Sequence, residues 1–273
     1  MPSRVFVIAE AGSTHDGDLD KARRLVELAK ACDADAVKFQ FWSSAERLAE
    51  RRRAPDYLET YRRYQMPRAW LEPLWRACEV QEIEFMATTY LPEDVATIAP
   101  FVSRFKIASF EAADLGFVRA HFAFEKPLYV STGMLGVPEM QRLVWSGAAG
   151  LDLDRDVLLH CVSAYPCPPQ DLHLRTIAEM NYGIDGVALR GLSDHTPSLL
   201  AGAVAVGAGA VVIEKHVKLH ETAPTNPDAA VALGPRWLRQ YIAQIREAEV
   251  LMGEPISRPL PVEAPMRRYQ VRA

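Results

Sequence analysis

The sequence is poor in cysteine, in long apolar runs and in excess charge of either sign. Its four cysteines, Cys32, Cys78, Cys161 and Cys167, include no CxxC pair of the kind that zinc sites use. They are also too few for a disulfide scaffold, so we expect reduced thiols in a cytoplasmic protein. Apolar stretches such as 201–213 are shorter than the roughly 18–20 residues that span a bilayer.

The charge balance and the beginning of the chain exclude further classes of protein. Lys and Arg total 31 against 35 Asp and Glu, a net charge of −4, so no basic excess attracts nucleic acid or a membrane surface. Glu10 and His15 stand where the apolar core of a signal peptide would continue. The 273 residues, 49% of them hydrophobic, suffice for a large core. We therefore expect a globular protein with no nucleic-acid or membrane partner.

Short apolar runs alternate with amphipathic stretches along the whole chain. The predicted strands are Val5–Ala9, Ala36–Gln40, Ile83–Thr88, Ser103–Ile107, Pro127–Ser131, Val157–Cys161, Gly186–Leu189 and Ala210–Glu214. The predicted helices are Leu19–Ala31 with Asp18 as N-cap, Trp70–Cys78, Pro92–Ile98, Leu115–Ala123, Pro138–Trp145, Leu172–Met180, Leu199–Val206 and Trp237–Met252. Eight strand–helix units in about 250 residues predict a single-domain α/β fold, a (β/α)8 TIM barrel, with an open doubly wound sheet as the alternative.

One connection is much longer than the others. Residues Ser43–Arg68 follow the second predicted strand and carry seven arginines, three of them consecutive at Arg51–Arg53. Such a run is usually the solvated face of a helix, and a phosphate-binding lid is the alternative.

Polar side chains gather where the predicted strands end. They are Glu10, Lys38, Gln40, Thr88, Lys106, Ser109, Glu111, Ser131, His160, Ser163, Tyr165, Ser193, Asp194, His195, Glu214 and His216. Barrel enzymes build their active sites at this end of the strands. Three pairs, Lys38 with Gln40, Ser193 with His195, and Glu214 with His216, are spaced by two residues and therefore share a face of a strand.

The residue types at this end suggest two kinds of ligand. Lys38 and Lys106 interrupt apolar runs, and a buried lysine requires a compensating anion. Either a rim carboxylate such as Glu10 or Glu111 pairs with each lysine, or both lysines and the nearby hydroxyls bind a phosphate-plus-carboxylate ligand, which we favour. His195 and His216 could hold a divalent metal together with Glu10 or Asp228.

Seven phrases of the sequence resemble the N-acetylneuraminate (sialic acid) synthase family. They occur in the family's order and spacing: V-I-A-E-A-G-S-T-H-D-G-D (7–18), A-D-A-V-K-F-Q (34–40), F-K-I-A-S-F-E (105–111), S-T-G-M (131–134), L-L-H-C-V-S-A-Y-P (158–166), G-L-S-D-H-T (191–196) and V-I-E-K-H (212–216). The resemblance implies a barrel that condenses phosphoenolpyruvate with an open-chain 2-acylamino sugar. The products would be a nine-carbon 3-deoxy-2-keto acid and phosphate.

The resemblance also implies roles for individual residues. Phosphoenolpyruvate would be bound by Lys38, Thr88, Lys106, Ser109, Ser131, Ser163 and Ser193, where Ser163 replaces the family's asparagine. The sugar would contact Gln40, Tyr165 and Asp228, and the reaction centre would be lined by Glu10, Glu111, Glu214 and Tyr165. His195 and His216 would bind Mn²⁺ or Mg²⁺, and the enzyme would be a homodimer. Glu111 is our first choice for the carboxylate beside C2 of phosphoenolpyruvate.

The sequence departs from the family pattern in several places. The family's N-H-N-G is T-H-D-G here, Phe110 replaces a glycine and Thr89 replaces a proline, mostly on the sugar side of the site. Family members continue into an antifreeze-like domain that supplies an arginine to a partner's site. We expect a catalytic barrel over residues 1–252 and a tail over residues 253–273 that resembles the linker to that domain. The 43–68 segment would then fold over a barrel mouth and supply the missing cation from Arg51–Arg53.

Three other functions are compatible with these residues. A 3-deoxy-ulosonate synthase that acts on a phosphorylated aldose would use the arginine cluster for the distal phosphate. A noncatalytic barrel would retain only the anion site, although the paired lysines, histidines and carboxylates argue against it. A metal-dependent isomerase or lyase would not release phosphate from phosphoenolpyruvate.

Overall fold

Eight parallel strands close into a barrel in the order β1 to β8 in this computed structural model, which describes residues 4–145, 150–152, 154–179 and 189–271. The strands are β1 (Phe6–Gly12), β2 (Ala36–Phe41), β3 (Glu84–Thr89), β4 (Phe105–Ile107), β5 (Leu128–Ser131), β6 (Val157–His160), β7 (Leu189–Asp194) and β8 (Val212–His216). Strand β1 pairs in parallel with both β2 and β8, which closes the barrel. The predicted TIM barrel is confirmed, and the open sheet is wrong.

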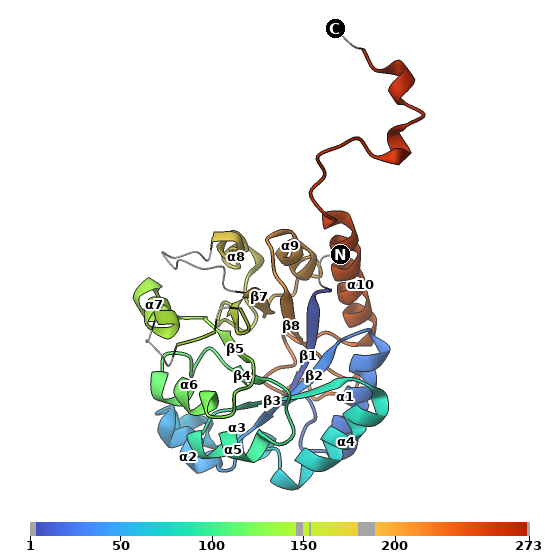
Figure 1. Ribbon diagram of the computed structural model, residues 1–273. Helices are drawn as coiled ribbons and strands as arrows, with labels where there is room; N and C mark the ends of the chain where they lie inside the picture. Colours follow the sequence, from blue (N-terminus) through green and yellow to red (C-terminus); the bar gives the residue numbers. More distant parts are fainter. Residues whose placement is uncertain (1–3, 146–149, 153, 180–188, 272–273) are drawn as a thin grey trace.

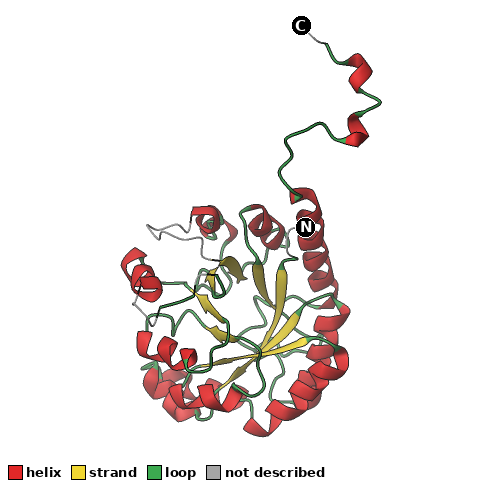
Figure 2. Ribbon diagram, viewed as in Figure 1, coloured by secondary structure: helices red, strands yellow, loops and turns green. Residues whose placement is uncertain are grey.

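Helices surround the strands, as Figures 1 and 2 show. They are α1 (Leu19–Ala31), α2 (Ala45–Arg51), α3 (Leu58–Tyr64), α4 (Leu71–Gln81), α5 (Val95–Ile98), α6 (Leu115–Phe122), α7 (Val137–Trp145), α8 (Arg175–Glu179), α9 (Ala201–Gly207) and α10 (Pro235–Met252). Short 3₁₀ turns lie at 55–57, 68–70, 92–94, 169–171, 261–263 and 267–269. Asp18 caps α1 as predicted, because its carboxylate accepts from the amides of Asp20 and Lys21.

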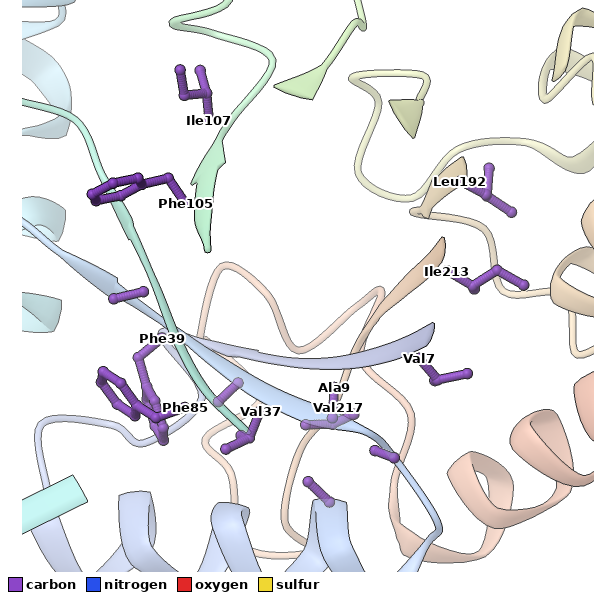
Figure 3. Close-up of a cluster of buried hydrophobic side chains, with 14 of the residues drawn as sticks. Val7, Ala9, Val37, Phe39, Phe85, Phe105, Ile107, Leu192, Ile213 and Val217 are labelled. Carbon is purple, nitrogen blue, oxygen red and sulfur yellow. The ribbon is translucent and has the colours of Figure 1, made fainter. Parts of the chain in front are cut away.

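The alternation of side chains along each strand divides the core in two. Inside the barrel lie Ile8, Ala36, Met86, Tyr129, Val157, Leu159 and Val212. The residues between them belong to the layer between strands and helices, and Figure 3 shows Val7, Val37, Phe39, Phe105, Ile213 and neighbours from this cluster. The apolar interior fills the lower barrel, so the polar residues that follow on the same strand faces are left at the mouth.

Strand β7 differs most from its prediction. The chain was expected to be extended at Gly186–Leu189, but the described strand begins at Leu189 and runs to Asp194; residues 186–188 lie outside the described part. Ser193 and Asp194 are therefore within the strand rather than after it. Gly191 lacks the β-branched side chain that is typical of a strand. It is nevertheless required within β7, because a Cβ at this position would lie 2.4 Å from the carbonyl oxygen of Val212 on β8. The close packing of the barrel interior, which the sequence pattern does not display, requires glycine at this point.

The long connection after β2 is folded rather than open. Its residues form α2, a 3₁₀ turn and α3, and we refer to Ala45–Tyr64 as the mouth segment. Trp42, Leu48, Tyr64, Tyr90 and Leu91 belong to one buried cluster that attaches this segment to the loop after β3. The segment is thus held by its own small core.

After α10 the chain leaves the barrel, as Figure 1 shows in red. Every residue from Gly253 to Val271 is exposed. No helix among the described residues is both long and apolar enough to cross a membrane.

Candidate active site

A cavity of about 940 Å³ opens at the carboxyl ends of the strands. Of the predicted site residues, the cavity is lined by Glu10, Lys38, Gln40, Lys106, Ser109, Glu111, Ser131, Tyr165, Ser193, His195, Glu214, His216 and Asp228. The three pairs spaced by two residues all reach it, because each pair stands on one inward face of its strand. Thr88 and Ser163 do not line the cavity themselves but bond to residues that do.

Two lysines and two glutamates form a buried charge cluster at the floor of this cavity. Lys38 Nζ lies 2.5 Å from Glu10 Oε2 and 3.5 Å from Glu214 Oε2. Lys106 Nζ lies 3.7 Å from Glu214 Oε1. All four side chains are at most 4% exposed. In this structure the lysines are therefore compensated by rim carboxylates, as one of the two interpretations of the sequence required, although the partner of Lys106 is Glu214 rather than Glu111.

Burial and mutual attraction act in opposite directions on these charges. Burial raises the pKa of Glu10 to about 7 in spite of the nearby Lys38. Burial alone would also raise the pKa of Glu214, but Lys106 and Lys38 outweigh it and lower that pKa to about 2. Burial lowers the pKa of Lys106. The two carboxylates thus differ in proton affinity although both face the same lysines.

The predicted hydroxyl groups surround this cluster. Lys38 donates to Thr88 Oγ1 at 2.9 Å, and the Ser193 hydroxyl donates to Glu214 Oε1 at 3.0 Å. Ser109 and Ser163 bond to each other at 2.8 Å. Within the described part of the chain, the buried Ser131 hydroxyl has no hydrogen-bond partner. Buried polar atoms are normally paired, so this hydroxyl is available to a ligand.

Two histidines stand side by side at the ends of β7 and β8. The ring centroids of His195 and His216 are 5.6 Å apart, and Tyr165 packs on His195 at 4.1 Å. Nδ1 of His195 bonds to the carbonyl oxygen of Val162 at 2.9 Å, which leaves Nε2 for another partner. His216 Nδ1 is buried and, within the described residues, makes no hydrogen bond; Asp228 Oδ1 is 3.9 Å away.

These donors fit a divalent metal, since each histidine has a nitrogen available and a carboxylate is near. Burial, followed by the nearby His216 ring, lowers the pKa of His195 to about 4, so the ring is neutral as metal binding requires. Among the described residues no group of three or more His, Cys, Asp or Glu is already arranged around one point. The remaining ligands would come from a moving carboxylate, water or substrate.

The loop after β1 fixes Asp228. Both the amide and the hydroxyl of Ser13 donate to Asp228 Oδ2, at 2.8 and 2.7 Å. Asn226 bonds to the carbonyl of Ser13 and to Asp16, at 2.8 and 2.9 Å, and accepts from the Asp228 amide at 3.0 Å. One oxygen of Asp228 is therefore held by the protein, and the other faces His216. Gln40 donates to Glu10 Oε1 at 3.0 Å.

Sequence reasoning missed Ser13, Asn226 and an aromatic wall formed by Trp42, Tyr61, Tyr64 and Tyr90. Ser13 directly follows β1 and could have been found from its position at a strand end. Asn226, Trp42 and Tyr90 lie in loops, and Tyr61 and Tyr64 lie in α3. The approach of these segments to the cavity depends on tertiary packing.

The mouth segment reaches the cavity through two of its three consecutive arginines. Arg51 and Arg52 line the cavity, and Arg53 does not. Arg52 bonds to Glu111 at 2.7 Å and Arg51 to Asp114 at 2.8 Å. The expectation that the segment folds toward a barrel mouth agrees with these contacts, and the mouth is its own. Arg51 and Arg52 bring cations to the cavity, where each is paired with a carboxylate, whereas Arg53 does not line the cavity.

Comparison with known proteins matches residues 25–257 to the NeuB family. The chain belongs to that family. It is 34% identical to the N,N'-diacetyllegionaminic acid synthase of Legionella pneumophila, over 96% of this chain and 78% of that protein. It is 30% identical to the human N-acetylneuraminate-9-phosphate synthase, over 94% of this chain and 74% of that protein.

A solved structure agrees with the fold. The crystal structure of the N-acetylneuraminic acid synthetase of Leptospira borgpetersenii in complex with citrate superimposes with a TM-score of 0.84 and 25% identity, over 98% of this chain and 91% of that one. The NeuB family membership confirms the resemblance that the seven phrases indicated.

Proposed function

We propose that this protein condenses phosphoenolpyruvate with the open-chain form of a 2-acylamino sugar, giving a 3-deoxy-2-keto sugar acid and inorganic phosphate. The observation that carries the proposal is the joint presence, in one barrel mouth, of two buried lysines with hydroxyls and of two adjacent histidines. Two NeuB relatives, named as synthases of N,N'-diacetyllegionaminic acid and of N-acetylneuraminate 9-phosphate, support the proposal.

The lysine cluster is suited to bind phosphoenolpyruvate. Lys38 and Lys106 would each donate a charge-assisted hydrogen bond to its phosphate or carboxylate. Further bonds would come from hydroxyls around them: Thr88, Ser109, Ser131, Ser163 and Ser193. The unpartnered Ser131 hydroxyl supports this assignment.

His195 and His216 would hold the divalent metal, Mn²⁺ or Mg²⁺, with Glu10 or Asp228 as a further ligand. When bound, such an ion supplies Lewis acidity that polarises the aldehyde oxygen of the sugar. Gln40, Tyr165 and Asp228 would orient the sugar so that its aldehyde carbon faces C3 of phosphoenolpyruvate.

The bond changes then follow from the chemistry of an enol ester. C3 attacks the aldehyde carbon, the aldehyde oxygen gains a proton, and C2 becomes electron-poor. Water adds to C2, and a carboxylate takes the proton that this water releases. The tetrahedral product loses phosphate when the C2–O bond breaks, which leaves the 2-keto acid. Glu111 is the carboxylate that we assign to the water, with Glu10 and Glu214 lining the reaction centre.

The alternatives fit less well. Four relatives that are 29–34% identical to this chain are named as synthases of N,N'-diacetyllegionaminic acid, pseudaminic acid or N-acetylneuraminate 9-phosphate, which favours an acylamino sugar as the acceptor. In addition, the two inner arginines that would bind a distal phosphate are already paired.

The test is a phosphate-release assay with phosphoenolpyruvate, Mn²⁺ or Mg²⁺ and a panel of acylamino sugars. We expect release only when phosphoenolpyruvate, metal and an aldose are all present. Steady release without an aldose, or full activity after metal stripping in a strong chelator, would contradict the mechanism.

The proposed setting of the enzyme is the cytoplasm. All four cysteines are buried and free, which suits a reducing compartment such as the cytoplasm. A homodimer is the assembly that the family resemblance implies.

A further inference from the structure

Arg52, the residue that caps the C-terminus of α2, holds one oxygen of Glu111. Its Nε and Nη2 both donate to Glu111 Oε1, at 2.9 and 2.7 Å. The Glu111 side chain is only 2% exposed, and its other oxygen, Oε2, is buried with no hydrogen-bond partner among the described residues. A carboxylate that is fixed at one oxygen and has no hydrogen-bond partner at the other can accept a hydrogen bond from a ligand at the free oxygen.

The guanidinium of Arg52 is itself held from several directions. Its Cζ lies 4.7 Å from the ring centroid of Tyr90, 4.9 Å from that of Phe110 and 5.9 Å from that of Tyr61. Tyr90 follows β3, Phe110 follows β4, and Tyr61 belongs to α3 of the mouth segment. Contacts of this kind favour a planar guanidinium over an ammonium group. The position of Arg52 is therefore defined by the mouth segment and by two loops of the barrel rim together.

We propose that Arg52 is the positioning residue for Glu111, so that the packing of the mouth segment on the barrel rim places the water-activating carboxylate. The inference rests on the proposed function, in which Glu111 takes the proton of the water that adds to C2. Arg52 itself touches no reacting atom. Its two donated bonds orient the carboxylate and leave Oε2 as the acceptor at the cavity.

The charges around Glu111 agree with this role. Burial raises the pKa of Glu111, and Arg52 opposes the rise most strongly, followed by Arg51 and Lys106. The phenols of Tyr90 and Tyr61 also lie beside the pair, and Arg52 Nη1 donates to Tyr61 Oη at 3.5 Å. Without Arg52 the pKa of Glu111 would rise further, so the ionised base would exist only at higher pH.

The experiment compares Arg52→Met, Arg52→Lys, Glu111→Gln and the double variant R52M/E111Q. For R52M we expect kcat to fall roughly 10- to 100-fold, KM for phosphoenolpyruvate to change little, and the acidic limb of the kcat–pH profile to move to higher pH. R52K should recover part of kcat, because it restores the charge without the fork. In the double variant, R52M should add no further loss to that of E111Q. The control is Arg47→Met, an exposed arginine of the same helix that pairs with Glu93.

Two results would overturn the inference. One is a change confined to KM for the sugar, which would make Arg52 a direct sugar contact. The other is a double variant in which the two losses multiply. If the wild type releases no phosphate with any sugar, the proposed function fails instead. In that case the inference about Arg52 is tested by an infrared pH titration of the Glu111 carboxyl band, which is identified by its loss in E111Q. A titration midpoint that is the same in wild type, R52M and R52K would refute positioning of Glu111 by Arg52.

Discussion

At the scale of single residues, Gly12 shows how one position can shape the site without contributing a reactive side chain. It has a φ of 51°, and a Cβ there would lie 2.4 Å from Asp228 Oδ2. Only glycine combines that backbone conformation with the close approach of the carboxylate. The shape of the β1 loop and the position of Asp228 are thus decided by the same residue.

Lys38→Ala should weaken binding of phosphoenolpyruvate about tenfold or more. A charge-assisted hydrogen bond to an anion contributes about 1.5–3 kcal/mol, and the variant also leaves Glu10 without its closest cation. Calorimetric titration with phosphoenolpyruvate measures the change. Lys30→Ala is the matched control, because this exposed lysine bonds only a backbone carbonyl of the barrel's outer layer. Equal affinities in wild type and K38A would refute the anion assignment.

His195→Ala and His216→Ala should each lose Mn²⁺ binding while the barrel remains folded. Both histidines lie at the rim, where side chains contribute little to the packing of the barrel core. Titration with the metal alone, followed by electron paramagnetic resonance, provides the binding curve, and circular dichroism provides the fold. His220→Ala, an exposed histidine in the loop after β8, serves as control. If a variant largely unfolds, and the fraction that remains folded still binds Mn²⁺, the histidine has a structural role instead.

At the scale of elements, α6 buries one histidine against the barrel. His121 is 1% exposed, bonds to the carbonyl oxygen of Phe117 in its own helix at 2.9 Å and packs against Phe105 of β4. Burial lowers the pKa of His121 from 6.5 to about 4. The folded protein therefore keeps this ring neutral while the unfolded chain protonates it.

The sign of the pH effect follows from linkage. The stabilisation from neutral His121 is fully present above pH 6.5 and is lost as the pH falls toward 4, by up to about 3 kcal/mol. Between pH 7.5 and pH 5, we expect the unfolding free energy of the wild type to fall by about 2 kcal/mol more than that of His121→Leu. Urea unfolding of both proteins at the two pH values measures this difference. A variant with the same pH dependence as the wild type would contradict it.

At the scale of the whole molecule, the barrel and the tail are distinct. The tail follows α10 and runs away from the barrel (Figure 1). Its side chains are exposed, including the apolar residues Ile256, Val262 and Tyr269. We propose the domain boundary at residue 252. Since exposed side chains add little to the stability of the barrel, a chain ending at Met252 should unfold within about 2 °C of the full chain.

The same comparison tests the assembly. Calorimetry measures the midpoint of unfolding, and analytical ultracentrifugation measures the molecular mass of both chains. A drop of much more than about 4 °C would contradict the boundary, because roughly 1 kcal/mol or more would then come from the tail. A truncated chain that is monomeric beside a dimeric full chain would place the tail in the subunit contact. Two monomers would refute the proposed homodimer.

The sequence by itself determined the barrel, its mouth and the charged and hydroxyl-bearing floor of the cavity. Strand periodicity is local, and parallel strands of one sheet necessarily end at one edge, so residues such as Lys38, Ser193 and His216 could be placed together without coordinates. The limits of β7 could not be predicted, because Gly191 is selected by a neighbouring strand rather than by its own propensity.

Only the tertiary structure decided which charges pair and which loops reach the site. Lys106 pairs with Glu214, which is 108 positions away in the sequence. Arg52 pairs with Glu111 across 59 positions, and Ser13 bonds to Asp228 across 215 positions. Such pairings depend on the heights at which side chains emerge in a closed barrel and on how the mouth segment packs against Tyr90 and Phe110. No local pattern encodes these distances, because each is the sum of many packing contacts between elements remote in the chain.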